Sequence, residues 1–339
     1  MAEGSIVVVG AGIVGASLAY HLAGRGRPVT LIDAGLPGSG ATRASFAWIG
    51  LPFTGGLPSA PLRCLALDEY RRLEAELPEL SIRWSGSIIS GDETPGPRTD
   101  DVRALEPHLL DPPAAAVHRP EDAALDPVAT TDLLVAAARD RGARLLTGVS
   151  VTSLVRQGNA VNGVQTTAGV VSAETVILAA GTGTVALCSG IGVDMPVESS
   201  PAVLVRLRAT PGLVRTIVAT PSLEVRQLTD GTVLSPTEYR GETDQAALLE
   251  TARRVRDRFA ASFSGADGTE IVSAEIGWRP MPADGEPIIG RPAGTRGLYV
   301  TVMHSAITLA AAAGRLAAEE ILTGLTAPEL AGCRPDRFR

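Results

Sequence analysis

The chain has 339 residues, of which 45% are apolar and 20% are charged, and its formal net charge is −7 at pH 7. This length is greater than one compact core usually needs, so we expect two domains or one domain with a large insertion. The sequence has no cluster of basic residues that would bind phosphates along a nucleic acid, so no nucleic-acid partner is expected.

The residue types that are missing exclude several chemistries. All 30 basic residues are arginine, so a Schiff-base lysine, a pyridoxal phosphate anchor and a Walker A lysine are impossible. The four histidines are scattered with no pair at i, i+4, and we expect no metal site. The three cysteines form neither a disulfide framework nor a zinc pattern; they are Cys64, Cys188 and Cys333.

The N-terminus and the apolar segments indicate where in the cell the protein is expected to be. The N-terminus lacks the basic region that precedes the apolar run of a secretory signal, and no segment reaches about 18 apolar residues without charge. We therefore expect no membrane span, and a reducing cytoplasm is the simplest location for a chain with these cysteines.

The first 33 residues predict a strand, a helix and a second strand. The apolar, β-branched run 5–9 is typical of a buried parallel strand, and residues 16–22 continue as a helix that ends near Gly24. Residues 28–33 form the second predicted strand. This order is that of a βαβ unit, and the Gly-, Ser- and Pro-rich segment that begins at Gly35 must be a loop.

The rest of the chain alternates helical and strand patterns. Helical periodicity predicts three further helices, at 62–77, 127–141 and about 244–262. A long last helix is expected to run to about Thr323, with Ser305 as its N-cap. Short β-branched segments separated by turn residues predict strands at 81–90, 143–151, 153–156, 161–166, 169–172, 175–180 and 299–302. The segment 193–275 is rich in strands apart from its one helix.

Glycines at the first strand-to-helix turn form the GxGxxG motif of dinucleotide-binding proteins. Gly10 permits the tight turn, Gly12 lets a pyrophosphate approach the backbone, and Gly15 lets the helix pack closely on the strand. The helix N-terminus offers N–H groups and partial positive charge to phosphates, and Asp33 can accept hydrogen bonds from ribose hydroxyls. The motif suits both NAD and FAD. The polar loop after Asp33 favours FAD, because it can wrap around the phosphates and the flavin.

Six segments in order along the chain carry a more specific pattern. They are VVVGAGIVGASLAYHLAGRG, GSGATRAS, ALDPVATTDLLVAAARDRGARLLTGVSVTSL, VILAAGTGT, GWRPMPADGEPIIG and GLYVTVMHSAITLAAAAGRLAAEEIL. Together they resemble the D-amino-acid oxidase-like family of FAD-dependent oxidoreductases, which includes glycine oxidase and sarcosine oxidase. The resemblance covers most of the chain, and its most specific segment is Gly277 to Gly290.

The resemblance implies an α/β fold with a Rossmann-type FAD-binding domain and a mixed β-sheet cap domain that binds the substrate. We expect the FAD-binding domain at 1–80, 127–190 and 276–339, and the cap domain at 81–126 and 191–275. The implied reaction oxidises a C–N bond: a hydride leaves the carbon next to an amine for flavin N5, and water hydrolyses the resulting imine. The implied partners are a small amine or amino acid and molecular oxygen or another electron acceptor, and a homo-oligomer is left open.

The resemblance assigns substrate contacts to a few side chains. Arg279, between Trp278 and Pro280, would bind a substrate carboxylate in a bidentate manner, as the matching arginine does in glycine oxidase; a structural salt bridge is the alternative. His304 precedes the last helix and would position the flavin or act as an acid or base. Further candidates for the substrate pocket, with core packing as the alternative for the first two, are Phe46, Trp48, Arg226 and Tyr239.

A larger set of residues is expected to contact FAD. The loop after the second strand would line the phosphates or the flavin, and the adenine contact would lie near Val151. The N-terminal dipole of the last helix would face the pyrimidine edge of the flavin, where negative charge appears on reduction; a plain core helix is the alternative. The expected FAD-binding residues are Gly10, Gly12, Ile13, Val14, Gly15, Asp33, Ala34, Thr42, Arg43, Ala44, Ser45, Val151, Ala180, Gly181, Ser305, Ala306, Ile307 and Thr308.

Departures from the family pattern leave the substrate and the electron acceptor open. The segment VMHSAIT has Met303 and Ala306 where relatives carry glycines, and SLEVRQLTDG lacks the aromatic residue that usually closes the pocket. No cysteine lies near Gly277 to Gly290, so FAD is expected to bind non-covalently. No lysine can assist oxygen, so a dehydrogenase with another acceptor is an alternative to an oxidase. The competing functions are an NAD(P)-dependent dehydrogenase and a non-catalytic flavin-binding subunit.

Overall fold

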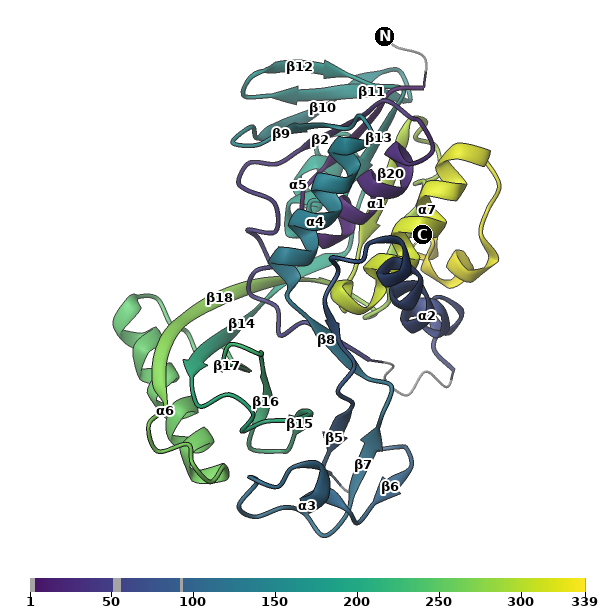
Figure 1. Ribbon diagram of the computed structural model, residues 1–339. Coiled ribbons are helices and arrows are strands. Elements are labelled where there is room, and N and C mark those ends of the chain that lie inside the picture. Colours follow the sequence, from purple (N-terminus) through teal and green to yellow (C-terminus); the bar gives the residue numbers. More distant parts are fainter. Residues whose placement is uncertain (1–3, 51–55, 92–93, 339) are drawn as a thin grey trace.

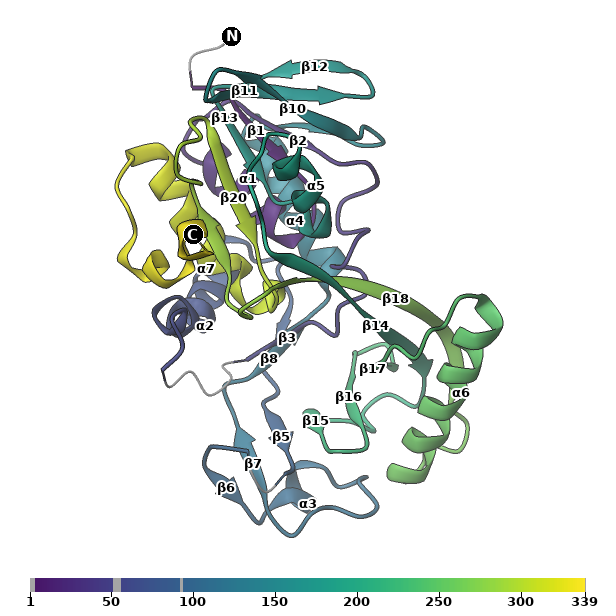
Figure 2. The ribbon, with the colours of Figure 1, turned by 180° about the vertical axis from the view of Figure 1, so that it is seen from behind.

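A computed structural model describes residues 4–50, 56–91 and 94–338. The chain forms two lobes, which are the upper and lower halves of Figure 1. Two long strands, β14 (Val197–Arg208) and β18 (Glu270–Pro282), run from one lobe into the other, as Figure 2 shows from behind. The lobes therefore share a pair of hydrogen-bonded strands and are not joined by a single linker.

The upper lobe is built on a six-stranded sheet whose central region contains β1 (Ile6–Val9). The strand order is β19-β20-β13-β1-β2-β9, and neighbours pair in parallel except at the antiparallel edge strand β19. The other strands are β2 (Val29–Ile32), β9 (Arg144–Leu146), β13 (Thr175–Leu178), β19 (Ile288–Gly290) and β20 (Leu298–Val302). The central strands consist mainly of buried Val, Ile and Leu, as a parallel sheet covered on both faces requires.

Helices cover one face of this sheet, and a small antiparallel sheet covers the other. The helices are α1 (Ile13–Ala23), α4 (Pro127–Asp140) and α7 (Ala306–Thr323), with α2 (Ala60–Glu76) packed against α7. On the opposite face lie β10 (Val151–Gln157), β11 (Ala160–Thr166), β12 (Gly169–Ser172) and α5 (Thr184–Ser189). Alternate residues of β1 accordingly enter two separate cores, Ile6 and Val8 on the helical side and Val7 and Val9 on the other.

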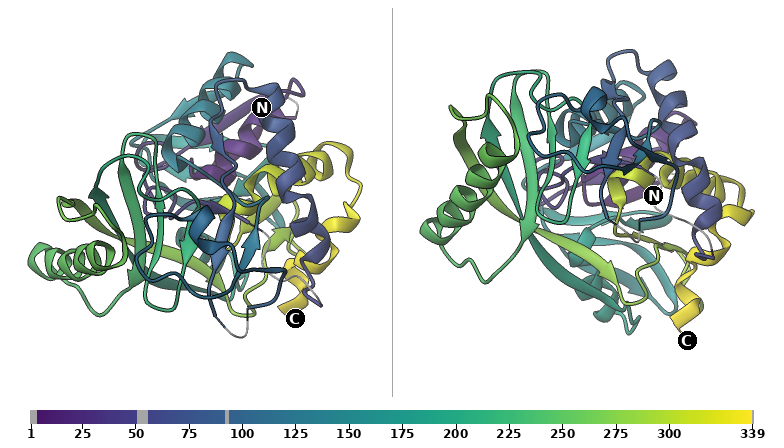
Figure 3. Two further views of the ribbon diagram at one scale, coloured as in Figure 1. Left: turned by 60° about the horizontal axis from the view of Figure 1, so that its bottom comes forward. Right: turned by 90° about the horizontal axis from the view of Figure 1, so that it is seen from below.

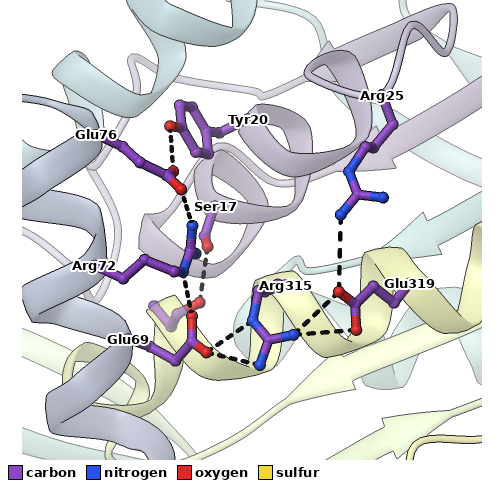
Figure 4. A network of polar contacts seen from close by, with 9 residues as sticks. Ser17, Tyr20, Arg25, Glu69, Arg72, Glu76, Arg315 and Glu319 are labelled. Carbon is purple, nitrogen blue, oxygen red and sulfur yellow. Dashed lines mark hydrogen bonds and ion pairs between the residues drawn. The ribbon is translucent and has the colours of Figure 1, made fainter.

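Polar contacts connect α1, α2 and α7 (Figure 4). Arg315 on α7 contacts Glu69 on α2 at 2.7 Å and Glu319 on its own helix at 3.0 Å. Between α1 and α7, a Cβ added to Gly314 would lie 2.1 Å from the Ser17 hydroxyl, so only glycine permits this approach. The close packing fixes the starts of α1 and α7 relative to each other.

The lower lobe is an eight-stranded sheet with one long helix on its outer face (Figure 3). The strand order is β18-β14-β17-β16-β15-β5-β7-β6, in which β15 and β5 pair in parallel and the other neighbours are antiparallel. Helix α6 (Gln245–Ser262) packs on Val203 and Val205 of β14 in a separate core, beside the short helix α3 (Val102–Leu105). The remaining strands are β5 (Ser87–Ile89), β6 (Arg98–Thr99), β7 (Ala116–Arg119), β15 (Ile217–Ala219), β16 (Glu224–Gln227) and β17 (Thr232–Glu238).

A third sheet joins the lobes and consists of β3 (Trp48–Ile49), β8 (Ala123–Leu125) and β4 (Ile82–Arg83). Residues of β3 and β8 belong to the core of the upper lobe. Part of the segment 81–126, which the predicted boundaries place in the cap, thus packs with the upper lobe. The domain boundaries themselves stay a prediction.

The predicted fold class is confirmed, and the structure adds detail to two local predictions. The structure combines a Rossmann-type lobe with a mixed-sheet lobe, and each predicted helix is present. The segment 81–90 divides into β4 and β5, because the chain turns at Gly86, which has a φ of +72°. Ser305 occupies the N-cap position of α7, but its hydroxyl accepts no hydrogen bond from the helix, because its backbone is left-handed with a φ of +59°.

Two further predictions concern membranes and metals. Among the described residues, no helix is long and apolar enough to cross a membrane. The same residues contain no group of three or more His, Cys, Asp or Glu side chains that could hold a metal ion.

Candidate active site

A large cavity lies between the two lobes, at the ends of β1 and β20 where α1 and α7 begin. Its volume is about 1240 Å³, above the roughly 300–1,000 Å³ of ordinary small-molecule sites. It is lined by the starts of both helices, by the loop at 39–50 and by residues of β14 and β18. This volume suits an elongated ligand together with a second, smaller molecule.

Close backbone contacts require glycine at two positions of the turn at one end of the cavity. Gly10 has a φ of +101°, and a Cβ there would lie 2.4 Å from the carbonyl oxygen of Ala179. A Cβ on Gly15 would lie 1.9 Å from the carbonyl oxygen of Gly10. Both positions therefore exclude a larger residue. Gly12 faces the cavity, and its Cβ would lie 3.2 Å from the hydroxyl of Thr42.

Backbone amides also hold the polar groups at this end. Asp33 follows β2 and accepts hydrogen bonds from the amides of Ala11 at 2.6 Å and Gly35 at 2.7 Å. Thr42 accepts one from the amide of Ile13 at 3.2 Å. A carboxylate and the positive end of the α1 dipole are thus fixed on one wall, where ribose hydroxyls and phosphates would bind.

The start of α7 forms another wall of the cavity. Ser305 has a left-handed backbone and turns the chain from β20 into the helix. Tyr70 donates a hydrogen bond to the Ile307 carbonyl, and Thr308 donates one to the Trp48 carbonyl at 3.1 Å. The first turn of α7 is therefore held in place, with its N–H groups and its positive dipole end at the cavity.

Backbone strain gathers at the same place. Among the described residues other than glycine, Ala47 and Ser305 have a positive φ, and both line the cavity. Such conformations cost about 1–3 kcal/mol and persist where neighbouring contacts enforce them, commonly at binding sites. For Ala47 these contacts are its amide to the Ser45 hydroxyl at 3.0 Å and its carbonyl to the Leu125 amide at 3.4 Å.

Arg279 reaches the cavity from β18. Its Nε donates to the carbonyl of Ser200 at 3.3 Å, and its Nη2 donates to the Ser200 hydroxyl at 2.8 Å. Both acceptors are uncharged, and among the described residues no carboxylate lies within 4.0 Å of the guanidinium. The alternative of a structural salt bridge is therefore not found in this part of the chain, and an anionic ligand would complete the site.

His304 also lines the cavity, immediately before α7. Burial, together with the positive charges of Arg279 and Arg63, holds the pKa of His304 below its usual range. The ring is therefore neutral near pH 7. Its Nδ1 lies 3.4 Å from the Ser305 hydroxyl. A neutral imidazole can both donate and accept a hydrogen bond, so it can position a ligand without adding a second cation.

Most of the predicted FAD contacts meet in this one cavity, and its features fit the group. The glycine turn and the start of α1 fit a pyrophosphate, Asp33 fits a ribose, and the start of α7 fits the pyrimidine edge of a flavin. The predicted contacts that line the cavity are Gly10, Gly12, Ile13, Val14, Asp33, Ala34, Thr42, Ala44, Ser45, Val151, Ala180, Gly181, Ser305, Ala306, Ile307 and Thr308.

A comparison with known protein families agrees with this geometry. The family described as "FAD dependent oxidoreductase" (DAO) matches residues 5–320. The chain belongs to this family. It is accordingly an enzyme of the FAD-dependent oxidoreductase class, and the Rossmann-type lobe is the part that carries the family's dinucleotide motif.

The match to two named relatives covers 93% of this DAO-family chain in one case and 61% in the other. It is 26% identical to the glycine oxidase of Bacillus licheniformis, over 93% of this chain and 92% of that protein. It is 31% identical to the 4-methylaminobutanoate oxidase (formaldehyde-forming) of Paenarthrobacter nicotinovorans, over 61% of this chain and 28% of that protein.

Solved structures share the fold. Glycine oxidase from Bacillus cereus superposes with a TM-score of 0.84 at 22% identity, over 95% of this chain and 96% of that chain. L-proline dehydrogenase from P. horikoshii superposes with a TM-score of 0.87 at 23% identity, over 99% and 98%. At these identities the likeness establishes the architecture.

Two predicted FAD contacts of this DAO-family protein lie outside the cavity lining. Gly15 is packed against the Gly10 carbonyl behind the turn, so its role is to seat α1. The Arg43 guanidinium is turned to Glu275, with an Nε–carboxylate distance of 3.2 Å, and the Arg43 carbonyl accepts from Arg206 at 2.6 Å. Arg43 thus joins the lobes at the edge of the site.

Two pocket candidates are also placed elsewhere, contrary to the prediction. Arg226 is 4% exposed and donates to the carbonyls of Phe46 and of Leu125, the latter at 2.9 Å. Burial lowers the pKa of this guanidinium. Tyr239 packs on Trp278, with ring centroids 6.1 Å apart. Arg226 therefore connects the lower sheet to the upper lobe by hydrogen bonds. Tyr239 lies behind Trp278, which lines the cavity.

The aromatic candidates Phe46 and Trp48 do line the cavity, with their rings 6.4 Å apart. The Trp48 indole donates to Asp122 at 2.9 Å, and this carboxylate also accepts from Ser87 at 2.6 Å. Sequence reasoning missed Glu224, which lines the cavity from β16. Its one signal was position, because it lies two residues from Arg226 in a segment already expected to form the pocket.

Proposed function

We propose that this chain uses FAD to oxidise a C–N bond of a small amino acid or amine. The observation that carries the proposal is that one cavity holds the glycine-rich start of α1, the start of α7 and the Arg279 guanidinium. The first two suit a flavin dinucleotide, and the third suits a substrate carboxylate. The names of the relatives, glycine oxidase and 4-methylaminobutanoate oxidase, support this substrate class.

The walls of the cavity have separate tasks. Amides at the start of α1 would receive the pyrophosphate, and the Asp33 carboxylate would accept hydrogen bonds from ribose hydroxyls. The start of α7 would direct its positive dipole end at the pyrimidine edge, where negative charge develops. When bound, FAD supplies the acceptor for the hydride that leaves the carbon bearing the amine.

Arg279 and His304 would orient the substrate. Arg279 has five N–H donors, and Ser200 occupies two of its nitrogens, so donors remain for a carboxylate. Holding the carboxylate would fix the adjacent carbon in one position, which lowers the entropic part of the barrier. His304 would hydrogen-bond the substrate or the cofactor as a neutral ring. Water would then hydrolyse the imine product.

Non-covalent binding of FAD is supported by the positions of the thiols. The three cysteines, one exposed and two buried, are absent from the residues described around the cavity. The chain has no lysine to assist oxygen, so the electron acceptor would be oxygen activated beside Arg279 or His304, or a different molecule. A cytoplasmic location and a homo-oligomer stay predictions.

An anaerobic flavin-reduction assay tests the proposal. The protein loaded with FAD would be titrated with glycine, N-methylglycine, both enantiomers of larger amino acids and small amines. We expect at least one of these compounds to bleach the visible absorption of oxidised flavin, and acid precipitation to release FAD into the supernatant. A protein that takes up no FAD would contradict the proposal. A yellow protein that no compound bleaches would support the non-catalytic subunit instead.

A further inference from the structure

Glu224 is a carboxyl group on the cavity wall to which the proposed reaction gives no role. It begins β16, and its side chain lies on the same face as that of Arg226, because alternate residues of a strand share a face. Arg226 donates to the carbonyls of Phe46 and Leu125, which belong to the other side of the cavity and to the upper lobe. This face of β16 is therefore turned toward the upper lobe.

The neighbouring strands give the same orientation. Arg226 lies opposite Leu234 in β17, and Leu234 lies opposite Arg206 in β14. Arg206 donates to the carbonyl of Arg43 at 2.6 Å, and so also points to the upper lobe. The aligned residues Arg226, Leu234 and Arg206 thus lie on the face of the sheet that is turned to the loop at 39–50. Glu224 lies on this same face, two residues from Arg226.

The carboxyl of Glu224 differs from the other carboxyls of the cavity. Asp33 accepts two amides, and Glu275 pairs with Arg43 at 3.2 Å. Among the described residues, nothing donates a hydrogen bond to the Glu224 carboxyl or forms an ion pair with it. Burial raises the pKa of Glu224, as expected for a poorly solvated acid without a partner. A carboxyl in such a place is costly unless a ligand supplies a donor.

The position of Glu224 relative to Arg279 limits what it can bind. β16 and β18 are three strand spacings apart, or about 14 Å. Continuing the printed register places Glu224 opposite Pro236, and thereby in the row of Leu204 and Glu275. Arg279 is four residues further along β18, or about 13 Å. The two side chains point into one cavity from distant places, so they cannot hold adjacent groups of one small molecule.

We infer that Glu224 selects substrates that carry a second cationic group, an ammonium or a guanidinium, several bonds from the amine that is oxidised. The inference rests on the proposed function, since it takes Arg279 as the partner of the substrate carboxylate. The reacting carbon would then lie near Arg279 and the second cation would neutralise Glu224. A neutral side chain of the same length would leave this carboxyl without a partner.

Binding of matched probes to the FAD-loaded protein tests the inference. Lysine and norleucine differ in the terminal ammonium, and arginine and citrulline differ in the charge of the terminal group. Both enantiomers of each would be measured by titration calorimetry with the wild type, Glu224→Gln and Glu238→Gln. Glu238 is an exposed residue on the adjacent strand β17 and is absent from the cavity lining, so its variant controls for a lost surface charge.

We expect the wild type and Glu238→Gln to bind the cationic member of each pair about tenfold to a hundredfold more tightly than the neutral one. In Glu224→Gln this ratio should fall to near one. Equal binding within each pair by the wild type, a ratio that survives in Glu224→Gln, or no binding of any probe would overturn the inference. The flavin-reduction assay is read separately, so failure of the proposed oxidation is distinguished from failure of this cation site.

Discussion

One side of the cavity is formed mainly by backbone groups, and the other side is formed mainly by side chains. At the start of α1 the site consists of backbone: glycines without room for a Cβ, and amides that hold Asp33 and Thr42. On the lower sheet the site depends on side chains whose partners come from distant segments, as Arg279 does on Ser200. Arg226, which lies outside the cavity lining, likewise holds the carbonyl of Phe46. A local sequence pattern can therefore specify the first side, whereas the role of a residue on the second depends on the assembled fold.

Gly12→Val should have the largest effect on ligand binding, because its side chain would occupy space at the side of the cavity that is formed by backbone groups. Its side chain would enter the space between α1 and the Thr42 hydroxyl that a pyrophosphate needs. We expect the purified variant to lose bound FAD, with an affinity weaker by roughly a hundredfold or more. Flavin absorbance per protein and FAD titration measure this. Gly268→Ala, at a glycine with no atom within 4 Å of its Cβ, is the control. Full flavin in Gly12→Val would place the phosphate site elsewhere.

Arg279→Ala probes the side built from side chains. The variant removes the guanidinium next to Ser200 and leaves the α1 turn intact, so FAD should still bind. The apparent affinity for a carboxylate-bearing substrate should weaken by about 2–4 kcal/mol, the cost of losing a desolvated charge-assisted pair. The concentration dependence of anaerobic flavin reduction measures it. Arg253→Ala on the exposed face of α6 is the matched control. An unchanged substrate affinity would remove Arg279 from the site.

Arg226→Met sharpens the contrast between two arginines of the same sheet. It leaves the buried carbonyls of Phe46 and Leu125 without their donor, which should lower the free energy of unfolding by about 3 kcal/mol. Because Arg226 does not line the cavity, the folded variant should keep its substrate affinity. Urea unfolding and flavin reduction measure the two quantities. A stable variant with poor substrate affinity would reverse the assignment.

The same contrast explains how far the sequence could predict the protein. The βαβ order, the GxGxxG turn and Asp33 are local, so they predicted the Rossmann-type lobe and its cavity wall. Arg226 and Tyr239 were predicted to line the pocket only because their strands belong to the cap. Their real contacts, to Phe46 and Trp278, join segments that no local pattern relates. Sequence reasoning missed Glu224 because its place at the cavity depends on the register of three strands, which the local sequence does not show.

The smallest effect is expected for His21 in α1, which lies outside the cavity lining, and it concerns the dependence of stability on pH. Its Nε2 is buried without a hydrogen-bond partner among the described residues. The charges of Arg72 and Arg315, which Figure 4 shows in the polar network, act on the ring. Burial, followed by the charges of Arg72 and Arg315, lowers the pKa of His21 to about 3 from the 6.5 of an unfolded chain. Between these two values the unfolded chain takes up a proton that the folded chain does not. Stability is therefore complete above pH 6.5 and falls as the pH is lowered through this window.

His21→Phe should remove this dependence. At pH 5, which is 1.5 units below 6.5, the wild type should have lost about 1–2 kcal/mol of unfolding free energy through this group. Urea unfolding of both proteins at pH 7 and pH 5 measures it, and the variant should lose less than the wild type by that amount. FAD affinity at pH 7 should be the same in both, because His21 does not line the cavity. An equal loss in both proteins would mean that the folded chain protonates His21 as readily as the unfolded one, and hence that α1 leaves the ring accessible to water.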